Sequence, residues 1–458
     1  MLFQTWPFLA FFAVVYPVYL LTKGTRLRLP WLLAASYFFY AWLSPLYLIP
    51  LAYATVVDYF VAGRIEKGLH KKAWLFVSIA NNVTVLAFFK YAGFIAENIN
   101  ALLSSVQAPY VVPAPGFLLP AGLSFYLLQS IGYTIDVYRG TAQREKSFLA
   151  YAAFVSFFPR LLAGPIERAN HLLPQLRTGP RVSARQFTDG LSIFVVGYFK
   201  KVALADYLAL YVGKVYGAPE EFHSAALLLA TFLFAWQIYF DFSGYTDMAR
   251  GVARMMGIRL MLNFDNPYLA VSMGDFWRRW HISLSSWFRD YVYIPLGGNR
   301  KGKPATYRNI FVTMVLSGLW HGAAWTFVLW GAVHATGNLA TREMERTPLY
   351  VRRVPKLVKQ LFVFALVMLA WIFFRAESIG DAWTIVVRIF TSGLADPHCP
   401  LLALALIAAV WCYQHLVESR VRWLLELRVV RIVLMILMLS YLVLTISAKG
   451  QPFIYMQF

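Results

Sequence analysis

Residues 310–340 read IFVTMVLSGLWHGAAWTFVLWGAVHATGNLA and contain no Asp, Glu, Lys or Arg. A helix that crosses the hydrocarbon core of a bilayer needs about 20 apolar residues, so this run is long enough for a hairpin of two spans. A second run of hairpin length lies at 29–62. Shorter apolar runs recur at 2–22, 73–96, 117–138, 187–205, 223–245, 360–375, 400–417 and 432–448. The sequence therefore predicts an all-α polytopic membrane protein with about 10–12 spans.

The composition is that of a chain whose main solvent is lipid. The 458 residues are 59% hydrophobic and 14% charged, whereas a soluble domain carries about 25% charged residues. The first run, 2–22, has no basic segment before it and no small-residue cleavage pattern after it, so we expect a retained span and not a signal peptide. Because Cys399 and Cys412 are the only cysteines, the sequence suggests neither a disulfide framework nor a metal site.

The net charge of +20, from 42 Lys and Arg against 22 Asp and Glu, is concentrated between the apolar runs. Cytoplasmic loops of membrane proteins are enriched in Lys and Arg. Most of the basic residues lie in seven segments that this rule places in the cytoplasm: 23–28, 64–72, 139–146, 160–185, 246–309, 341–359 and 418–431. Alternation then puts both termini outside, and we expect a multi-pass membrane protein. The excess of basic residues is explained by the orientation of the chain in the membrane, so no nucleic-acid partner is expected.

No internal repeat, low-complexity linker or soluble domain interrupts the chain, so we expect a single membrane-embedded domain over residues 1–458. One apolar stretch, 148–165, lies between basic segments and contains Pro159, Arg160 and Pro165. Non-helical backbone at membrane depth has to be buried in protein or line a cavity. This stretch is therefore predicted to be re-entrant or interfacial, and not a span.

The segment 274–296, GDFWRRWHISLSSWFRDYVYIPL, is predicted to form one helix in the cytoplasmic interface. At about 100° per residue its large apolar side chains share one face and its basic side chains share the other. The apolar face comprises Trp277, Trp280, Leu284, Trp287, Phe288 and Tyr291, and the polar face comprises Arg278, Arg279, Ser286, Arg289 and Asp290. His281 projects from the aromatic face. From this helix alone, a structural histidine bonded to a backbone carbonyl is the simpler interpretation.

His321 lies inside the uncharged run 310–340. An ionisable residue at that depth is costly, and by default it marks a pathway or an active site. Gly318 and Gly322 allow a neighbouring backbone or a ligand to approach it closely. Because desolvation keeps a buried imidazole neutral, His321 can act as a general base, whereas His334, nearer the basic end of the run, is interpreted as structural. Acyl transfer and a proton relay in a transporter both fit these histidines.

Four long motifs occur in the middle third of the chain, within the core region 239–331. They are YFDFSGYTDMARGVARMMG (239–257), NFDNPY (263–268), DFWRRWHISLSSWFRDYVYIPLGGNR (275–300) and SGLWHGAAWTFVLWG (317–331). In these motifs the chain resembles the membrane-bound O-acyltransferase family. It is most similar to the bacterial branch that contains the membrane subunits of alginate and peptidoglycan O-acetylation, to which the teichoic-acid D-alanylation protein is related.

The resemblance implies a helical fold around a central funnel that admits an acyl thioester from the cytoplasm. It implies that His321 is the catalytic intramembrane histidine and that His281 is the second, cytoplasmic-side histidine. The substrate or donor would bind at Arg278, Arg279, Trp280, Asn263 and Asp241. For the arginines, a basic surface that faces lipid headgroups is an equally good explanation, and Asp241 can order helices by hydrogen bonding instead. The donor would be acetyl-CoA or an acyl carrier thioester, used as a substrate, with no bound cofactor.

The chain ends in QPFIYMQF, in which Phe453, Tyr455 and Phe458 form an F-x-Y-x-x-F pattern. This ending, within 449–458, resembles the C-terminal motif of the acyl-relay branch, which implies that Tyr455 is a transient acyl acceptor. Tyr and Phe are also common at membrane interfaces. A phenol with a pKa of about 10 needs a base before it attacks a thioester at neutral pH, and His321 would be that base. We expect the ending to reach the outer mouth of the funnel.

These observations predict a membrane acyltransferase that moves an acetyl group from a cytoplasmic thioester to the outside, for O-acetylation of a polysaccharide. An extracytoplasmic O-acetyltransferase would be a separate partner protein, and membrane lipid would surround the chain. Three alternatives are transfer of D-alanyl or another acyl group to a cell-wall polymer, a proton-coupled transporter or exporter, and a non-catalytic scaffold. The lack of inverted repeats and of paired intramembrane carboxylates argues against a transporter.

Overall fold

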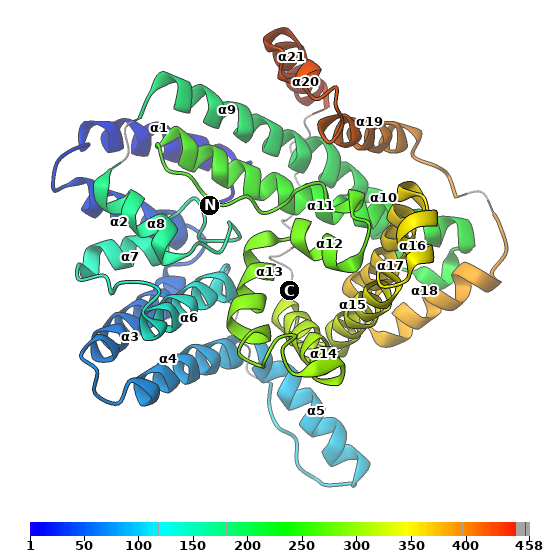
Figure 1. Cartoon of the computed structure of the whole chain (residues 1–458), viewed down its shortest axis with the longest axis horizontal. Coiled ribbons are helices and arrows are strands. Elements are labelled where there is room, and N and C mark those ends of the chain that lie inside the picture. The colour runs from blue at the N-terminus through cyan, green and yellow to red at the C-terminus, as the bar shows by residue number, and fades with distance from the viewer. Residues whose placement is uncertain (115, 117–118, 180–181, 396, 446–453, 455–458) are drawn as a thin grey trace. The chain divides into compact units, whose positions relative to one another are not determined.

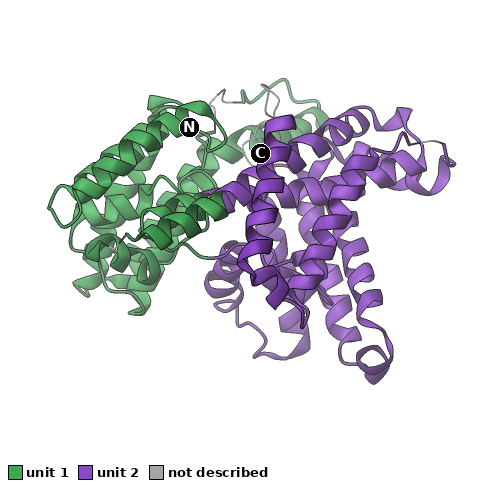
Figure 2. Cartoon of the chain, turned by 90° about the horizontal axis from the view of Figure 1, so that it is seen from above, with its two compact units in different colours: residues 1–194, 249–261 green, residues 195–248, 262–458 purple. Residues whose placement is uncertain are grey.

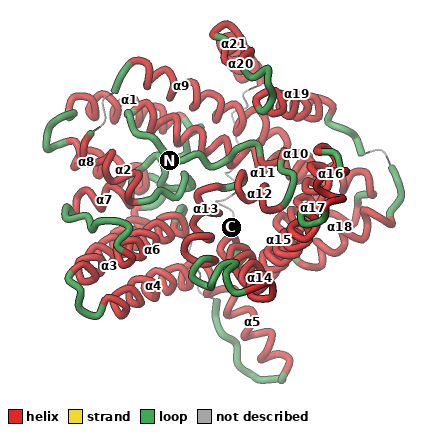
Figure 3. The backbone as a smooth tube through the Cα atoms, viewed as in Figure 1, coloured by secondary structure: helices red, strands yellow, loops and turns green. Residues whose placement is uncertain are grey.

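The computed structural model describes every residue except 115, 117–118, 180–181, 396, 446–453 and 455–458. In that part of the chain the regular elements are helices, and no strand is present (Figures 1 and 3), which confirms the all-α class. The helices are α1 (Trp6–Leu21), α2 (Arg28–Ala41), α3 (Leu48–Glu66), α4 (Lys71–Leu86), α5 (Ala92–Ser105), α6 (Leu123–Arg139), α7 (Phe148–Ser156), α8 (Ala169–Thr178), α9 (Ala184–Tyr198), α10 (Asp206–Tyr216), α11 (Ser224–Met255), α12 (Met273–Arg279), α13 (Ile282–Phe288), α14 (Gly302–His321), α15 (Trp325–Met344), α16 (Pro348–Arg353), α17 (Lys356–Arg375), α18 (Ile379–Thr391), α19 (Leu401–Val417), α20 (Trp423–Glu426) and α21 (Arg428–Thr445).

Several helices continue into short segments of other helical geometry. Three π-helical segments occur at Ala87–Tyr91, Phe199–Ala205 and Arg289–Tyr293. Short 3₁₀ turns occur at Pro45–Tyr47, Pro219–Glu221 and Pro267–Leu269, each beginning with proline. A π-helical turn widens the helix locally and often occurs at functional sites.

Among the described residues, four helical stretches are long and apolar enough to cross a membrane. They are Pro45–Glu66, Lys71–Ser105, Ser224–Met255 and Lys356–Arg375, and two shorter apolar helices are Trp6–Leu21 and Leu401–Val417. All of them fall on apolar runs of the sequence, so the multi-pass character is confirmed. The total of about 10–12 spans stays a prediction.

The chain divides into two compact units, which Figure 2 shows in different colours. Unit 1 comprises residues 1–194 and 249–261, and unit 2 comprises residues 195–248 and 262–458. Each unit buries a large set of aromatic and aliphatic side chains. The single membrane-embedded domain over 1–458 stays a prediction.

Unit 1 packs α3 against α4, α6 and α7 around buried polar contacts. Asp58 of α3 accepts hydrogen bonds from Ser78 (2.7 Å) and Asn82 (2.9 Å) of α4, and all three side chains are fully buried. Such bonds hold helices together because a polar group that lacks a partner is costly inside a membrane protein.

The stretch 148–165 in unit 1 is not a span. α7 ends after nine residues, roughly 13 Å of helix, and 157–167 continue as buried backbone without a regular helix. The amide of Phe158 donates to the hydroxyl of Ser36 (3.1 Å), and the fully buried Arg160 donates to the side chain of Gln129. Other parts of the protein therefore provide hydrogen-bond partners for this segment, as non-helical backbone at membrane depth requires.

In unit 2, α14 and α15 form a helical hairpin over the run 310–340, and α15 also packs against α17. Neither helix is among the four stretches that are long and apolar enough to cross a membrane, so the two spans predicted here stay a prediction. Glycines let the two backbones approach closely. A Cβ on Gly318 would lie 2.1 Å from the carbonyl oxygen of Phe327, and a Cβ on Gly331 would lie 2.5 Å from that of Met314. Any larger residue at these positions would push α14 and α15 apart.

The prediction of one interfacial helix over 274–296 is wrong. The segment consists of α12, α13 and the π-helical segment after them, and the helix breaks at Trp280 and His281. His281 has a φ of 42°, in the left-handed region, and the carbonyl of Asn263 accepts the amide of Ile282 (2.9 Å). The amide of Ile282 therefore bonds to a residue outside the segment instead of to a carbonyl of the same helix. The periodicity of the sequence cannot reveal such a partner. Five of the six residues of the predicted apolar face are buried: Trp277, Trp280, Leu284, Trp287 and Phe288. The sixth, Tyr291, is partly buried, and Phe276 and Ser283 are buried although they were not assigned to that face.

Candidate active site

His321 is the last residue of α14 and is 3% exposed. Aromatic rings enclose its imidazole in edge-to-face contacts. The distances between ring centroids are 4.9 Å to Trp320, 5.0 Å to Trp330 and 5.5 Å to Phe374. The chain leaves the helix at Gly322, where a Cβ would lie 1.9 Å from the ring of Phe327. The hairpin turn and its glycine thus fix the place of the imidazole.

His281 precedes α13 and is fully buried. Its Nδ1 lies 3.1 Å from Oδ1 of Asn263, which also accepts the amide (3.2 Å) and the hydroxyl (3.0 Å) of Ser283. A backbone amide can only donate, so Asn263 presents its oxygen there and Nδ1 of His281 carries the proton. Burial lowers the pKa of His281 to about 3, and the ring is therefore neutral at physiological pH, with its lone pair on Nε2.

The structure brings the two predicted catalytic histidines together through Trp320. The centroid of the Trp320 ring lies 6.2 Å from that of His281 and 4.9 Å from that of His321. His334 continues this row of rings, because Trp330 lies 5.0 Å from His321 and 4.5 Å from His334. His334 is fully buried, and in the described part of the chain neither of its ring nitrogens has a hydrogen-bond partner. Its other aromatic neighbours are Phe276, Trp277 and Trp371.

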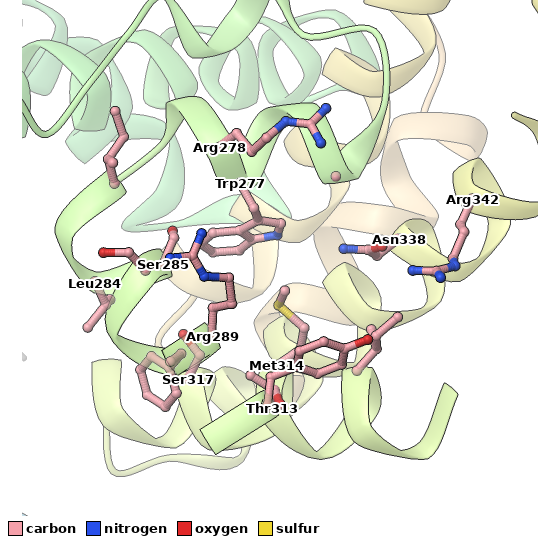
Figure 4. Close-up of a pocket in the computed structure, with 16 residues that line it drawn as sticks. Trp277, Arg278, Leu284, Ser285, Arg289, Thr313, Met314, Ser317, Asn338 and Arg342 are labelled. Atoms are coloured by element: carbon pink, nitrogen blue, oxygen red, sulfur yellow. The ribbon is translucent and has the colours of Figure 1, made fainter. Parts of the chain in front are cut away.

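A cavity of about 380 Å³ lies beside this row of rings, between α14, α15 and the segment 274–296, which we call the broken segment. Figure 4 shows Trp277, Thr313, Met314 and Ser317 among its lining side chains. Ser317 precedes His321 by four residues, so the two side chains lie on one face of α14, one turn apart. The cavity therefore leads along α14 to within a helical turn of the catalytic candidate.

Three arginines line the same cavity, and Figure 4 shows the guanidinium groups of Arg278, Arg289 and Arg342. Arg278 lies 3.6 Å from Asp275, and Arg289 lies 2.8 Å from Asp290. Within the described residues, no carboxylate forms an ion pair with Arg342. Of the three, Arg278 was predicted as a donor-binding residue, whereas Arg289 was assigned to a polar face and Arg342 was missed. The sequence feature that points to Arg342 is its position: it is the first charged residue after the uncharged run, and it lies on α15 together with His334.

Three other predicted binding residues do not line the cavity. Arg279 is ion-paired with Asp275 (3.2 Å) and Glu418 (2.5 Å). Trp280 is fully buried in the aromatic core, and Asn263 holds the second histidine. The structure thus places these three residues where they support the site from outside the cavity.

Asp241 also lies away from the cavity, on α11. One of its oxygens lies 2.8 Å from Nζ of Lys201, and the other accepts the backbone amide of Ile454 (2.6 Å). Within 446–458, Ile454 is the one described residue. The residues of the predicted relay motif, Phe453, Tyr455 and Phe458, lie outside the described residues. Asp241 therefore contacts the C-terminal segment next to the predicted acyl acceptor.

Known proteins match the chain over most of its length. The family model described as MBOAT, membrane-bound O-acyltransferase family, matches residues 142–379. The chain belongs to the membrane-bound O-acyltransferase family. A probable alginate O-acetylase of Azotobacter vinelandii is 41% identical over 401 residues, which cover 86% of this chain and 79% of that protein. The peptidoglycan O-acetyltransferase of Helicobacter pylori is 36% identical over 389 residues, covering 77% and 72%. The teichoic acid D-alanyltransferase of Streptococcus thermophilus is 27% identical over 296 residues, covering 57% and 69%.

As a member of the membrane-bound O-acyltransferase family, the chain is a multi-pass membrane enzyme that transfers an acyl group to oxygen, and the predicted family and enzyme class are confirmed. The matched range contains His281, His321 and all the residues that line the cavity. Among the described residues, no group of three or more His, Cys, Asp or Glu side chains is placed to hold a metal ion.

Proposed function

We propose that this O-acyltransferase takes an acetyl group from a cytoplasmic thioester and moves it across the membrane for O-acetylation of an extracytoplasmic polysaccharide. The observation that carries the proposal is the row of buried rings in which Trp320 joins His281 to His321, beside a cavity lined by arginines. The names of two relatives, an alginate O-acetylase and a peptidoglycan O-acetyltransferase, support acetyl as the acyl group and a polysaccharide as the final acceptor.

The proposed donor is acetyl-CoA or an acetyl thioester on a carrier protein. Both carry phosphate on a pantetheine arm, and a guanidinium group binds phosphate with good geometry. Arg342 has no ion pair with a described carboxylate, so its charge is available to an anion in the cavity. Ser317 lines the cavity one helical turn from His321. The phosphate would bind at Arg342 and the arm would extend along α14, which brings the thioester toward His321.

The proposed acceptor is the phenol of Tyr455. As the phenol oxygen attacks the thioester carbonyl, His321 takes the hydroxyl proton. A C–O bond forms and the C–S bond breaks, which leaves an acetyl ester on the tyrosine and a thiolate. The thiolate then takes the proton back from the imidazolium of His321, so the base returns to its neutral form and the donor leaves as a thiol.

The proposed role of His281 is to position the donor or the base. Nδ1 of the ring donates to Oδ1 of Asn263, and the amide and hydroxyl of Ser283 hold that oxygen in place by two further hydrogen bonds. Because Nδ1 carries the proton, Nε2 is the nitrogen that can accept a hydrogen bond or a proton. The ring thus offers Nε2 as its one acceptor. The centroid of the His281 ring lies 6.2 Å from that of Trp320.

We place the enzyme in the bacterial inner membrane with both termini outside, as the positive-inside rule predicts. The basic segments then face the cytoplasm, where thioester donors are made. A separate extracytoplasmic O-acetyltransferase would move the acetyl group from Tyr455 to the polysaccharide. Membrane lipid would contact the exposed apolar side chains of the helices.

The test is mass spectrometry of the purified protein after incubation with acetyl-CoA. Wild type, His321→Ala, Tyr455→Phe and, as a control, His415→Ala on the exposed side of α19 are compared. We expect an acetyl group on the C-terminal peptide of wild type and of His415→Ala, and no acetyl group in the other two variants. Equal thioester turnover by wild type and His321→Ala would contradict the proposal. If wild type gains no acetyl group, acetyl-CoA as donor or Tyr455 as acceptor is wrong, and an acetylated carrier protein separates these two cases.

The alternatives predict different results. D-alanyl transfer requires that D-alanyl carrier protein competes with the acetyl donor, and it has weaker support, because the D-alanyltransferase relative has the lowest identity of the three. A proton-coupled transporter would give substrate-linked proton flux without acyl turnover, and a scaffold would tolerate His321→Ala in cells. Membership of an acyltransferase family argues against both.

A further inference from the structure

A buried group of charges in unit 2 holds the C-terminal segment by its backbone. Oδ2 of Asp241 accepts the amide of Ile454 at 2.6 Å, while Oδ1 lies 2.8 Å from Nζ of Lys201. The same ammonium group lies 2.7 Å from Oδ1 of Asp206. Asp241 and Lys201 are each 2% exposed, and Ile454 is 5% exposed. The four groups therefore form a connected, desolvated cluster.

The cluster can bind a backbone amide, because it contains a buried carboxylate oxygen that needs a hydrogen-bond donor. An isolated ion inside a protein is costly, and a buried ion pair is tolerated when its remaining polar capacity is satisfied. The ammonium group of Lys201 favours the ionised form of Asp241, and an ionised carboxylate makes a stronger, charge-assisted bond to an amide. In the described part of the chain, the amide of Ile454 is the donor that reaches Oδ2. Without that amide the buried oxygen would lose its partner.

The local structure presents the ion pair to the segment. Lys201 belongs to the π-helical segment Phe199–Ala205, and Asp241 lies near the middle of α11. The last described helix, α21, ends at Thr445, and the chain between Thr445 and Ile454 can span roughly 30 Å when extended. That length is sufficient to reach the middle of a membrane from one of its faces.

We propose that Asp241 and Lys201 form a latch that holds the C-terminal segment at Ile454 and so positions the residue that follows it for acyl transfer. Asp241 is a positioning residue, acting on the acceptor segment, and not the donor-binding residue that its motif suggested. The bond is made to a backbone amide, so it fixes the place of the segment without depending on the side chain at 454. The second half of the proposal rests on the acceptor role of Tyr455.

A neighbouring ion pair supplies a matched control. Lys200 and Asp247 come from the same two elements, lie 2.7 Å apart, and are partly buried. The latch pair, Lys201 and Asp241, and the control pair, Lys200 and Asp247, are therefore both Lys–Asp ion pairs. They differ in that Asp241 accepts the amide of Ile454.

The experiment measures hydrogen exchange at the amide of Ile454 in the purified full-length protein, without any donor. We expect protection in wild type and unchanged protection in Asp247→Asn. In Asp241→Asn and Lys201→Met we expect a loss of protection of about tenfold, because a charge-assisted hydrogen bond is replaced by a weaker, neutral one. Fast exchange in wild type, or equal protection in Asp241→Asn, would overturn the latch.

A second pair of variants keeps the test valid if Asp241→Asn does not fold. Ile454→Pro removes the donated hydrogen in the segment itself, whereas Ile454→Ala keeps it. With acetyl-CoA as donor, we expect Ile454→Pro to lower acetylation of the C-terminal peptide roughly 10- to 100-fold and Ile454→Ala to retain most of it. Equal acetylation in Ile454→Pro and Ile454→Ala would overturn the positioning role. Protection of Ile454 in a wild-type protein that gains no acetyl group would instead contradict the proposed function and leave the latch intact.

Discussion

The two histidines of the site lie in regions that are built differently. His321 ends the regular hairpin helix α14, and aromatic rings alone enclose it among the contacts described. His281 lies at the break between α12 and α13, with a left-handed backbone and a hydrogen bond to Asn263. In the first region the local structure is a regular α-helix, and the packed rings complete the site. In the second region a tertiary hydrogen bond determines the local structure.

This difference indicates a division of labour. A ring surrounded by packed aromatic side chains can change its hydrogen-bond partners during a reaction, which suits a base that takes and returns a proton. A ring held by a short polar network keeps one tautomer and one orientation, which suits a positioning group. The following predictions test this division, from the largest expected effect to the smallest.

His321→Ala is expected to lower acyl turnover by roughly 10² to 10⁴, because it removes the proposed general base. Added imidazole should restore part of the activity by occupying the space between Trp320 and Trp330. Turnover of acetyl thioester measures both effects, with His415→Ala as the control. No response to imidazole, together with normal folding, would mean that the ring does more than accept a proton.

Asn263→Ala is expected to lower the free energy of unfolding by about 3 kcal/mol, because three buried donors lose their acceptor. Ser283→Ala removes only the hydroxyl donor, so its cost should be about 1 kcal/mol. Denaturation in detergent compares the two variants. If both cost the same, the bonds to His281 and to the Ser283 amide contribute nothing, and the polar description of this region is wrong.

The stability of the protein should depend on pH through His281. An unfolded histidine has a pKa of about 6.5, and burial lowers the pKa of folded His281 to about 3. Between these values the unfolded state binds a proton that the folded state does not, so stability falls as the pH falls below about 6.5. At pH 5 the loss relative to pH 8 is about 2 kcal/mol. His281→Asn should reduce the difference between unfolding curves at the two pH values by that amount, and an unchanged difference would contradict a buried neutral ring.

Arg342→Gln is expected to raise the KM for acetyl-CoA about tenfold, as for loss of one charge-assisted bond to phosphate. The effect should shrink at high salt, because the contact is electrostatic. Arg346→Gln is the matched control, since Arg346 lies on the same side of the hairpin, is paired with Glu343 and does not line the cavity. A larger effect of Arg289→Gln than of Arg342→Gln would move the phosphate to the broken segment.

Glycine and alanine should rank in opposite order at the two histidine positions. At 281 the φ of 42° favours glycine over alanine by about 1 kcal/mol. At 321, the last helical residue of α14, glycine should be less stable than alanine by about 0.5 kcal/mol. Unfolding of the four variants measures both differences. The same order at both positions would remove the structural distinction between the two regions.

The sequence alone determined the class of the fold and much of the site. Long apolar runs allow only helices in lipid, because every backbone group must be satisfied within its own segment, and the hairpin at 310–340 followed from its length. The motifs identified the family and both histidines. Alternation of apolar and polar side chains also identified most of the buried residues of 274–296, although the helix there is broken.

The tertiary structure decided the features that depend on residues far apart in the chain. The bond between Asn263 and His281 crosses 18 positions, and the bond between Asp241 and Ile454 crosses 213. Helical periodicity describes a residue and its neighbours within a few turns, so it contains no information on such partners. Arg342 is the first charge after the uncharged run, but only the packing of α15 against α14 and the segment 274–296 brings its side chain to the cavity.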